Sequence, residues 1–207
     1  MRRRLTATAI IAILTVAVSA AAIFSGVNYW AVFGGFIPAR LTNLLLLQGA
    51  VPAVLTPWSS ALLHGSWVHL GVNMLMLLFV GVQVERIIGS AGLVVAYVIG
   101  ALVAAAAQFL VDPSGTIPMV GASGAISALF GLYALFFGRP KQFTQNQKLN
   151  RSIHVAWLLV TWVVLQWMAG VLAGGEGVML ATPAHIGGFI AGLLLQRPLL
   201  LWRYREA

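Results

Sequence analysis

Hydrophobic and polar positions follow one another in long blocks along this chain. Uncharged, mostly apolar stretches are separated by short segments that hold nearly all of the charged side chains. At 1.5 Å per residue, about 20 residues of helix cross the roughly 30 Å hydrocarbon core of a bilayer. The pattern predicts six membrane-spanning helices, at residues 5–24, 67–84, 91–111, 119–138, 153–172 and 184–202.

Residues 25–66 form the long connection between the first two predicted helices. Within this connection, residues 41–63 are also uncharged, but they include Gly49, Pro52, Pro57 and several polar side chains. Such a segment is poorly suited to a straight, lipid-exposed helix. We interpret it as a loop whose short helices lie in the membrane interface.

The basic residues favour the same count. With six spans and the N-terminus inside, only Arg40 lies outside, and the inner side holds Arg2, Arg3, Arg4, Arg86, Arg139, Lys141, Lys148, Arg151, Arg197, Arg203 and Arg205. A seventh span at 41–63 would invert the rest of the chain, leaving three basic residues inside and nine outside. The positive-inside rule rejects that arrangement. We therefore expect both termini to be cytoplasmic.

Composition sharpens the class of protein. Of the 207 residues, 60% are hydrophobic and 8% are charged, and the mean hydropathy is +0.95. Soluble domains carry about 25% charged residues. We expect one all-α, polytopic membrane domain covering residues 1–207.

The absence of cysteine from the sequence excludes disulfides and thiolate chemistry. The net charge of +8 lies mostly in loops that flank apolar segments, so we expect no nucleic-acid partner.

The N-terminal segment has a second interpretation. Three arginines followed by an apolar run and small residues at 19–22 are also typical of a secretory signal peptide. The run is long for a signal peptide, and we therefore favour a retained helix.

Four polar side chains are predicted at one depth. His69 and Asn73 lie one turn apart on the second helix, Ser123 lies in the first turns of the fourth, and His185 begins the sixth. Because these three helices run from outside to inside, all four side chains lie near their outer ends. A lone serine or histidine in a helix is more often a packing residue, but such a convergence favours a functional interior.

The residue types suit nucleophilic catalysis. A serine becomes a strong nucleophile when a neighbouring histidine takes its proton. The nearest carboxylates, Asp112 and Glu176, are assigned to loops, so we expect a serine–histidine dyad. His69, Asn73 and backbone N–H groups near the serine are candidate donors to a developing oxyanion, as is the positive end of the fourth helix.

Other polar and aromatic residues receive ordinary interpretations. We expect His154, Thr161 and Gln166 to be packing residues of the fifth helix. Its three tryptophans are expected to face lipid or the interface, as such side chains commonly do, and they are Trp157, Trp162 and Trp167.

Several motifs together resemble the rhomboid family of intramembrane serine proteases. They are His64-Gly-Ser-Trp-Val-His69-Leu-Gly-Val-Asn73, Gly81-Val-Gln-Val-Glu85-Arg-Ile-Ile-Gly89, Gly121-Ala122-Ser123-Gly124 and Ala184-His185-Ile186-Gly187-Gly188. A Gly-x-Ser-Gly sequence alone is weak evidence, but these motifs occur in order and on the matching helices of a six-helix core.

The resemblance implies a six-helix rhomboid-like bundle with Ser123 as nucleophile and His185 as general base. It assigns His69 and Asn73 to the oxyanion hole. It also implies cleavage of transmembrane segments of membrane-protein substrates near the outer leaflet of a bacterial inner membrane, with no cofactor and no metal. The residues it implies for structure are His64, Gly121, Gly124 and Gly188, and Gly188 to Gly192 has the small-xxx-small spacing of close helix contacts.

The chain departs from the family pattern at two places. The Trp-Arg pair of the first loop is absent, and the region reads Leu55-Thr56-Pro57-Trp58. An aromatic residue often follows the nucleophile by four positions and stacks on the histidine, but here that position is Ser127. What would hold the ring of His185 is therefore not evident from the sequence.

Two alternative functions remain open. One is a non-catalytic rhomboid-like factor for membrane-protein binding or quality control, although neither proposed catalytic residue is missing. The other is a metal-dependent enzyme using His64, His69 and His185. It is disfavoured because His64 and His69 are poorly spaced for one helical face, with no carboxylate ligand nearby.

Overall fold

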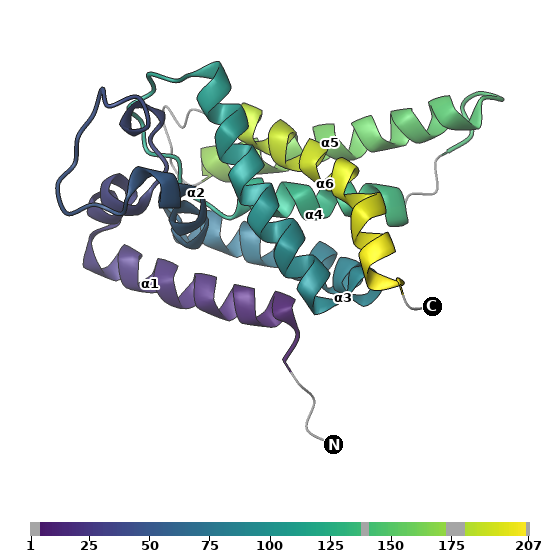
Figure 1. Cartoon of the computed structure of the whole chain (residues 1–207), viewed down its shortest axis with the longest axis horizontal. Coiled ribbons are helices and arrows are strands. Elements are labelled where there is room, and N and C mark those ends of the chain that lie inside the picture. The colour runs from purple at the N-terminus through teal and green to yellow at the C-terminus, as the bar shows by residue number, and fades with distance from the viewer. Residues whose placement is uncertain (1–4, 138–140, 173–180, 206–207) are drawn as a thin grey trace.

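The computed structural model describes residues 5–137, 141–172 and 181–205. Its helices are α1 (Ala7–Gly34), α2 (Thr56–Ser59), α3 (Trp67–Val111), α4 (Ser123–Phe136), α5 (Gln147–Leu172) and α6 (Thr182–Arg203), shown in Figure 1. Short 3-10 helices occur at Pro38–Arg40, Ala53–Leu55 and Ser60–Leu62. The described residues contain one isolated β-bridge and no strand. The predicted all-α class is confirmed.

Helix α3 comprises two of the predicted spans. Its 45 residues correspond to about 68 Å of helix in total, more than twice the roughly 30 Å core of a bilayer. The helix is broken at Gly89, whose φ of 76° lies in the left-handed region that glycine adopts most easily. The two arms, residues 67–88 and 90–111, correspond to the predicted helices 67–84 and 91–111. The chain reverses direction between the two arms, as Figure 1 shows.

Helix α1 also changes direction inside its assigned length. Gly26 has a φ of 123°, so the spanning part ends there and residues 27–34 form a separate short helical segment. This helical continuation lies within the predicted connection 25–66. The three 3-10 helices and α2 follow it.

Helix α4 begins later than predicted. Residues 119–121 lack helical structure because their backbone groups pair with the connection 35–66. Phe36 and Met119 exchange hydrogen bonds of 2.9 and 2.8 Å, and the Gly121 N–H donates to the Ser60 carbonyl at 2.9 Å. The predicted helix 119–138 therefore starts at Ser123. Its last predicted residue, 138, lies outside the described residues.

The core of the bundle surrounds α4. Nearly every side chain from Gly124 to Leu132 is buried. Helices α3, α5 and α6 pack around it, and Figure 1 shows α4 in their midst. With only 14 residues, roughly 21 Å, α4 is shorter than a typical span. Its polar groups are thereby screened from lipid by protein.

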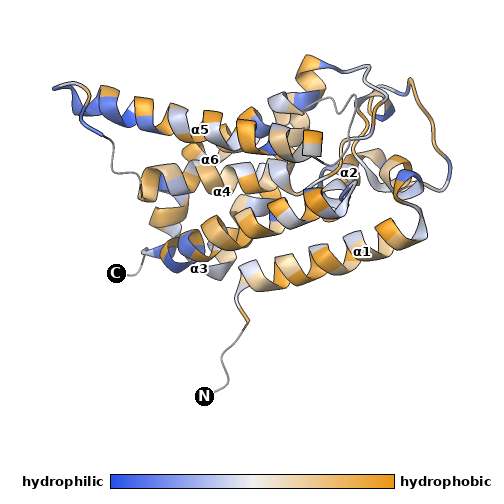
Figure 2. Ribbon diagram, turned by 180° about the vertical axis from the view of Figure 1, so that it is seen from behind, coloured by the Kyte–Doolittle hydropathy of each residue, from blue (hydrophilic) through white to orange (hydrophobic). Residues whose placement is uncertain are grey.

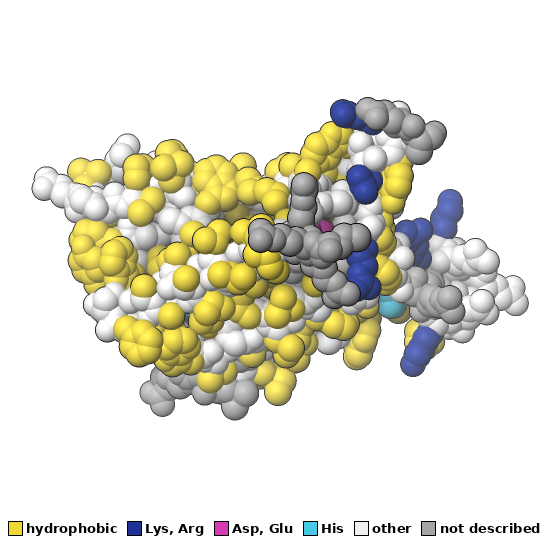
Figure 3. Space-filling model, turned by 90° about the horizontal axis from the view of Figure 1, so that it is seen from below, with side chains coloured by type: hydrophobic (Ala, Val, Ile, Leu, Met, Phe, Trp, Pro, Cys, Tyr) yellow, Lys and Arg dark blue, Asp and Glu magenta, His cyan; other side chains and the backbone are white. Residues whose placement is uncertain are grey.

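The outer surface of the bundle is apolar. Helices α1, α3 and α6 are long and apolar enough to cross a membrane. Large hydrophobic side chains on them are exposed, including Ile13, Phe24, Leu75 and Leu194, and Figure 2 shows the apolar colouring along the helices. In Figure 3 apolar side chains cover most of the visible face, whereas Lys and Arg gather at one end. The chain is a multi-pass membrane protein.

Glycines allow α6 to approach α4 very closely. A Cβ placed on Gly188 would collide with the Gly124 carbonyl oxygen, and one on Gly192 would collide with that of Ala128. On the other side of α4, a Cβ on Gly124 would lie 2.6 Å from the Ala104 side chain of α3. Small residues at such contacts bring helix backbones together where apolar driving force is weak.

Glu85 fastens α1 to the turn of α3. Its carboxylate accepts hydrogen bonds from the backbone N–H groups of Ala7 and Thr8, at 2.7 and 3.0 Å, and from the Thr8 hydroxyl at 2.6 Å. It also accepts from Ser90 at 2.7 Å, just beyond the break. A negative charge here satisfies orphan N–H groups of α1 and complements the helix dipole.

Polar contacts within the connection 35–66 and from it to α1 and α3 hold it in place. Arg40 is buried and donates from Nη2 to the Val51 carbonyl at 2.6 Å, while the Ser59 hydroxyl donates to Gly34 at 2.6 Å. The Trp58 indole donates to the Val98 carbonyl at 3.0 Å. The connection is therefore held by these contacts in the absence of the Trp-Arg pair that the rhomboid family pattern has in this loop.

Substitution of Gly192 by alanine is expected to destabilise the bundle. The added Cβ overlaps the Ala128 carbonyl oxygen, and overpacking of this kind costs about 1–3 kcal/mol. The midpoint of thermal unfolding in detergent should fall. The matched control is Gly71→Ala, because a Cβ on helical Gly71 meets no atom within 4 Å. Equal midpoints for the two variants would contradict the close contact.

Candidate functional site

Ser123 and His185 lie at the N-terminal ends of two neighbouring helices. Ser123 is the first residue of α4, and His185 lies in the first turn of α6. The distance between Ser123 Oγ and His185 Nε2 is 2.9 Å, although 62 positions separate the residues in sequence. The glycine contacts one turn further along α6 permit this approach.

The second ring nitrogen of His185, Nδ1, is buried. It makes no hydrogen bond to any residue that the structure describes. If Nε2 accepts the Ser123 hydroxyl proton, the ring proton resides on Nδ1. The described carboxylates lie elsewhere, Asp112 in the loop after α3 and Glu85 at the turn of α3. Within the described residues, the arrangement is therefore a pair without a third, acidic member.

His69 lies beside the same serine. A Cβ on Gly121 would lie 2.8 and 2.9 Å from Cε1 and Nε2 of His69, and 3.7 Å from Ser123 Oγ. The His69 imidazole and the Ser123 hydroxyl therefore both adjoin the space beside the Gly121 Cα. Gly121 has a φ of 125°, so both conformation and space require glycine at this position. Ser66 caps the start of α3 by accepting from the His69 N–H at 3.2 Å.

Asn73 is fully buried one turn after His69. Its side-chain Nδ2 donates to the His69 carbonyl at 2.9 Å, and Oδ1 has no partner in the part of the chain that the structure describes. The hydrogen bonds of the described residues do not join Asn73 to Ser123 or His185. The amide nevertheless retains a second N–H, because Nδ2 carries two.

The N-terminus of α4 is open. The residue that precedes it, Ala122, provides no side-chain cap, and the first turn contains no acidic residue. The first N–H groups of a helix lack partners within the helix and carry a partial positive charge. In α4 these N–H groups begin at Ser123, where they are available to bind a negatively charged oxygen.

His64 bridges three parts of the chain. Its Nε2 accepts from the Ala122 N–H at 3.3 Å, and its Nδ1 lies 2.9 Å from Ser19 Oγ, which donates to the Leu62 carbonyl at 2.8 Å. Burial, with a smaller effect from His69, lowers the pKa of His64 to about 3. The neutral ring can therefore accept at Nε2 and donate at Nδ1, and it joins α1 to the residue before Ser123.

Trp162 is not lipid-facing, contrary to the sequence prediction. Its side chain has 0% exposure, whereas Trp157 and Trp167 are 67% and 55% exposed. Residues five apart on a helix are rotated by about 140°, so three tryptophans at this spacing do not share one face. The sequence signal for Trp162 was the polar Gln166 one turn away, which marks the same side of α5 and is itself buried.

Ser127 connects Trp162 to Ser123. The Ser127 hydroxyl donates to the Ser123 carbonyl at 2.7 Å and accepts from the Trp162 indole N–H at 2.6 Å. The indole stacks on Phe130 with a centroid distance of 4.4 Å. Its ring centroid lies 6.3 Å from that of His185, at an interplanar angle of 74°.

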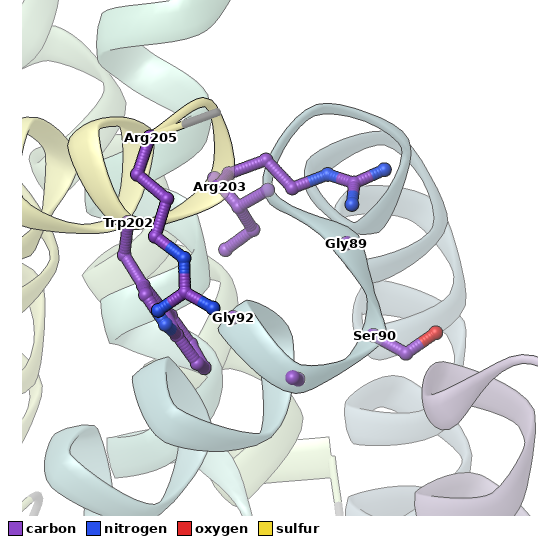
Figure 4. A pocket seen from close by; sticks show the side chains of 8 residues that line it. Gly89, Ser90, Gly92, Trp202, Arg203 and Arg205 are labelled. Carbon is purple, nitrogen blue, oxygen red and sulfur yellow. The ribbon is translucent and has the colours of Figure 1, made fainter. Parts of the chain in front are cut away.

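A pocket occurs at the other end of α6. It lies between the turn of α3 and the last residues of α6, and Figure 4 shows Trp202, Arg203 and Arg205 around Gly89 and Gly92. None of the predicted site residues lines it. The candidate site is the polar centre around Ser123, which has no part in this pocket.

The fold and this polar centre define a polytopic, all-α membrane protein in which a serine and a histidine meet inside the bundle. The sequence model of the Rhomboid domain matches residues 53–202, well over half of the chain. The chain therefore belongs to the rhomboid family.

Similar proteins come from plants and bacteria. The chain is 33% identical over 140 residues to RHOMBOID-like protein 5 of Arabidopsis thaliana, covering 67% of this chain and 42% of that protein. It is 30% identical over 139 residues to rhomboid protease GlpG of Pectobacterium atrosepticum, covering 67% and 46%. For rhomboid protease GluP of Bacillus subtilis the values are 30% over 152 residues, 72% and 26%. The matched region is less than half the length of each relative.

Replacement of His64 by alanine is expected to destabilise the protein. The change leaves the buried Ala122 N–H without its partner, and a lost buried hydrogen bond of this kind costs about 1–3 kcal/mol. Thermal unfolding in detergent measures the effect. His154→Ala is the matched control, since His154 Nε2 has no hydrogen-bond partner among residues 5–137, 141–172 and 181–205. Equal losses in both variants would contradict a bridging role for His64.

Proposed function

We propose that this chain is an intramembrane serine endopeptidase that cleaves transmembrane segments of membrane proteins. Ser123 is the nucleophile and His185 the general base. The observation that carries the proposal is the 2.9 Å distance between Ser123 Oγ and His185 Nε2 in a buried, glycine-lined contact of α4 with α6. Two of the relatives bear the name rhomboid protease.

The reaction begins with proton transfer from Ser123 Oγ to His185 Nε2 as Oγ attacks the carbonyl carbon of the scissile bond. A tetrahedral oxyanion forms and then collapses, and the leaving amine takes the proton from His185. Water next attacks the acyl-enzyme with His185 again acting as base, which releases the carboxylic acid and regenerates the serine. No net proton or electron is consumed by the enzyme.

The oxyanion would be stabilised by donors around Ser123. One support is the open N-terminus of α4 at Ser123. The other is the His69 ring, which adjoins the same space beside Gly121 as Ser123 Oγ does. Asn73 would contribute its second amide hydrogen after a side-chain rotation. This rotation is consistent with an Oδ1 that no hydrogen bond holds.

The site would face the outer leaflet of a bacterial inner membrane, with both termini in the cytoplasm. The support is the gathering of Lys and Arg at one end of the bundle, since basic residues favour the cytoplasmic side. Arg2 to Arg4 and Arg139 lie outside the described residues. Ser123 and His185 begin helices whose other ends approach that basic end.

A non-catalytic rhomboid-like function is the second candidate. It is favoured by the similarity to RHOMBOID-like proteins 4 and 5 of Arabidopsis thaliana, whose names state no protease activity. Retention of both Ser123 and His185 within hydrogen-bond distance favours the protease.

Ser123→Ala or His185→Ala is expected to abolish cleavage of a model single-span substrate in proteoliposomes. Each change removes the nucleophile or the base, which lowers rates by several orders of magnitude. Both variants should insert and unfold like the wild type. Ser152→Ala, at an exposed position of α5, and His154→Ala are the matched controls. Cleavage at the wild-type rate by Ser123→Ala and His185→Ala would refute the proposal.

Asn73→Ala and His69→Ala test the oxyanion donors separately. Loss of one donor typically lowers kcat by about 10²–10³ fold. We expect kcat for the same substrate to fall by this amount with little change in KM, because the donors act on the transition state. Gln83→Ala, on the same arm of α3, is the control, since its amide donates to the Phe79 carbonyl of its own helix. A rise in KM alone would indicate substrate binding instead of oxyanion stabilisation.

A further inference from the structure

We propose that Trp162 of α5 is the positioning residue that orients the imidazole of His185 toward Ser123. The inference rests on the proposed function of that pair. It assigns to the fifth helix a part of the catalytic arrangement that the sequence motifs on α3, α4 and α6 do not contain.

The need for such a residue follows from the surroundings of His185. A general base must hold Nε2 toward the hydroxyl, and a hydrogen bond to Nδ1 commonly fixes the ring. Among the described residues Nδ1 has no partner, and Ser123 Oγ is the hydrogen-bond contact of the ring. A single hydrogen bond leaves the imidazole free to rotate, so packing has to fix its plane.

Trp162 is the aromatic ring that meets His185. The two planes are inclined by 74° with centroids 6.3 Å apart, an edge-to-face arrangement that aromatic pairs prefer. Both rings lie inside the bundle, because Trp162 is fully buried and His185 nearly so. The indole therefore forms one rigid wall of the space in which the imidazole turns.

The indole is itself held on two sides by α4. Its N–H donates to Ser127 Oγ at 2.6 Å, and its face stacks on Phe130. Ser127 in turn donates to the carbonyl of Ser123. The Ser127 hydroxyl thus bonds both the Trp162 indole and the Ser123 carbonyl. This shared hydrogen bonding fixes the position of the indole relative to Ser123.

The small size of Ser127 is what admits the indole. Ser127 Cβ lies only 3.0 Å from the Cβ that would be added to Gly188, one turn beyond His185 on α6. Position 127 therefore adjoins the same turn of α6 as the histidine. A ring attached at position 127 would compete with the Trp162 indole for this space, so the aromatic wall comes from α5 in place of α4.

The experiment compares Trp162→Ala, Trp162→Phe and Ser127→Ala, with Trp167→Ala as the matched exposed tryptophan on the same helix. Three quantities are measured on the full chain in detergent. They are the rate at which a fluorophosphonate labels Ser123, the ¹⁵N chemical shifts of the His185 ring in histidine-labelled protein, and the midpoint of thermal unfolding. His185→Ala assigns the ring signals, and Ser123→Ala assigns the labelling.

Trp162→Ala should lower the labelling rate by up to about tenfold, the upper end of the factor that corresponds to loss of an aromatic pair. The His185 signals should change from one tautomer, protonated at Nδ1, to an average of both. Trp162→Phe should restore labelling to within about threefold and return the single tautomer, because the ring remains. Ser127→Ala should fall between these variants, and Trp167→Ala should match the wild type.

Wild-type labelling and an unchanged tautomer in Trp162→Ala would overturn the proposal. A loss of labelling in Trp162→Ala that Trp162→Phe does not restore would overturn it as well. If Trp162→Ala does not fold, Ser127→Ala decides, and wild-type behaviour there overturns it. Failure of the wild type to be labelled contradicts the protease function instead, and the ring signals still report whether Trp162 orients His185.

Discussion

The contact between α4 and α6 is the constraint on which the rest of this structure depends. Two glycines of α6 lie against carbonyl oxygens of α4, so the backbones meet with no side chain between them. Only at this separation does the ring of His185 reach Ser123 Oγ. In a membrane, where lipid is as apolar as a leucine side chain, such close packing replaces the hydrophobic effect as the force that joins helices.

Burial of α4 follows from the same contact. A helix of 14 residues with two serines would be a poor span in direct contact with lipid. Surrounded by α3, α5 and α6, it has its polar groups satisfied by protein, and Ser127 bonds both a carbonyl and an indole N–H. The bundle thus provides a polar interior that single helices of this sequence would not support.

Much of this arrangement could be predicted from the sequence, because length and hydropathy are sufficient to locate spans in a bilayer. The convergence of Ser123, His185 and His69 followed from placing polar residues at one depth. Two features did not follow. The start of α4 was displaced by backbone pairing of Met119 with Phe36, a contact between distant segments that local pattern does not encode. Trp162 was assigned to lipid because tryptophan is common there, although the polar Gln166 one turn away marked its side of α5 as inward-facing.

Helix α1 lies outside the region that the Rhomboid domain matches, yet it is not a detachable appendage. At one end Glu85 holds the first N–H groups of α1, and further along the helix Ser19 bonds the ring of His64, which reaches the backbone next to Ser123. A chain cut at the start of the matched region would remove α1 and leave the buried Glu85 carboxylate and the buried His64 ring without these hydrogen-bond partners. The boundary of sequence similarity is therefore not a boundary of physical independence, and the smallest autonomous unit of this protein includes its first helix.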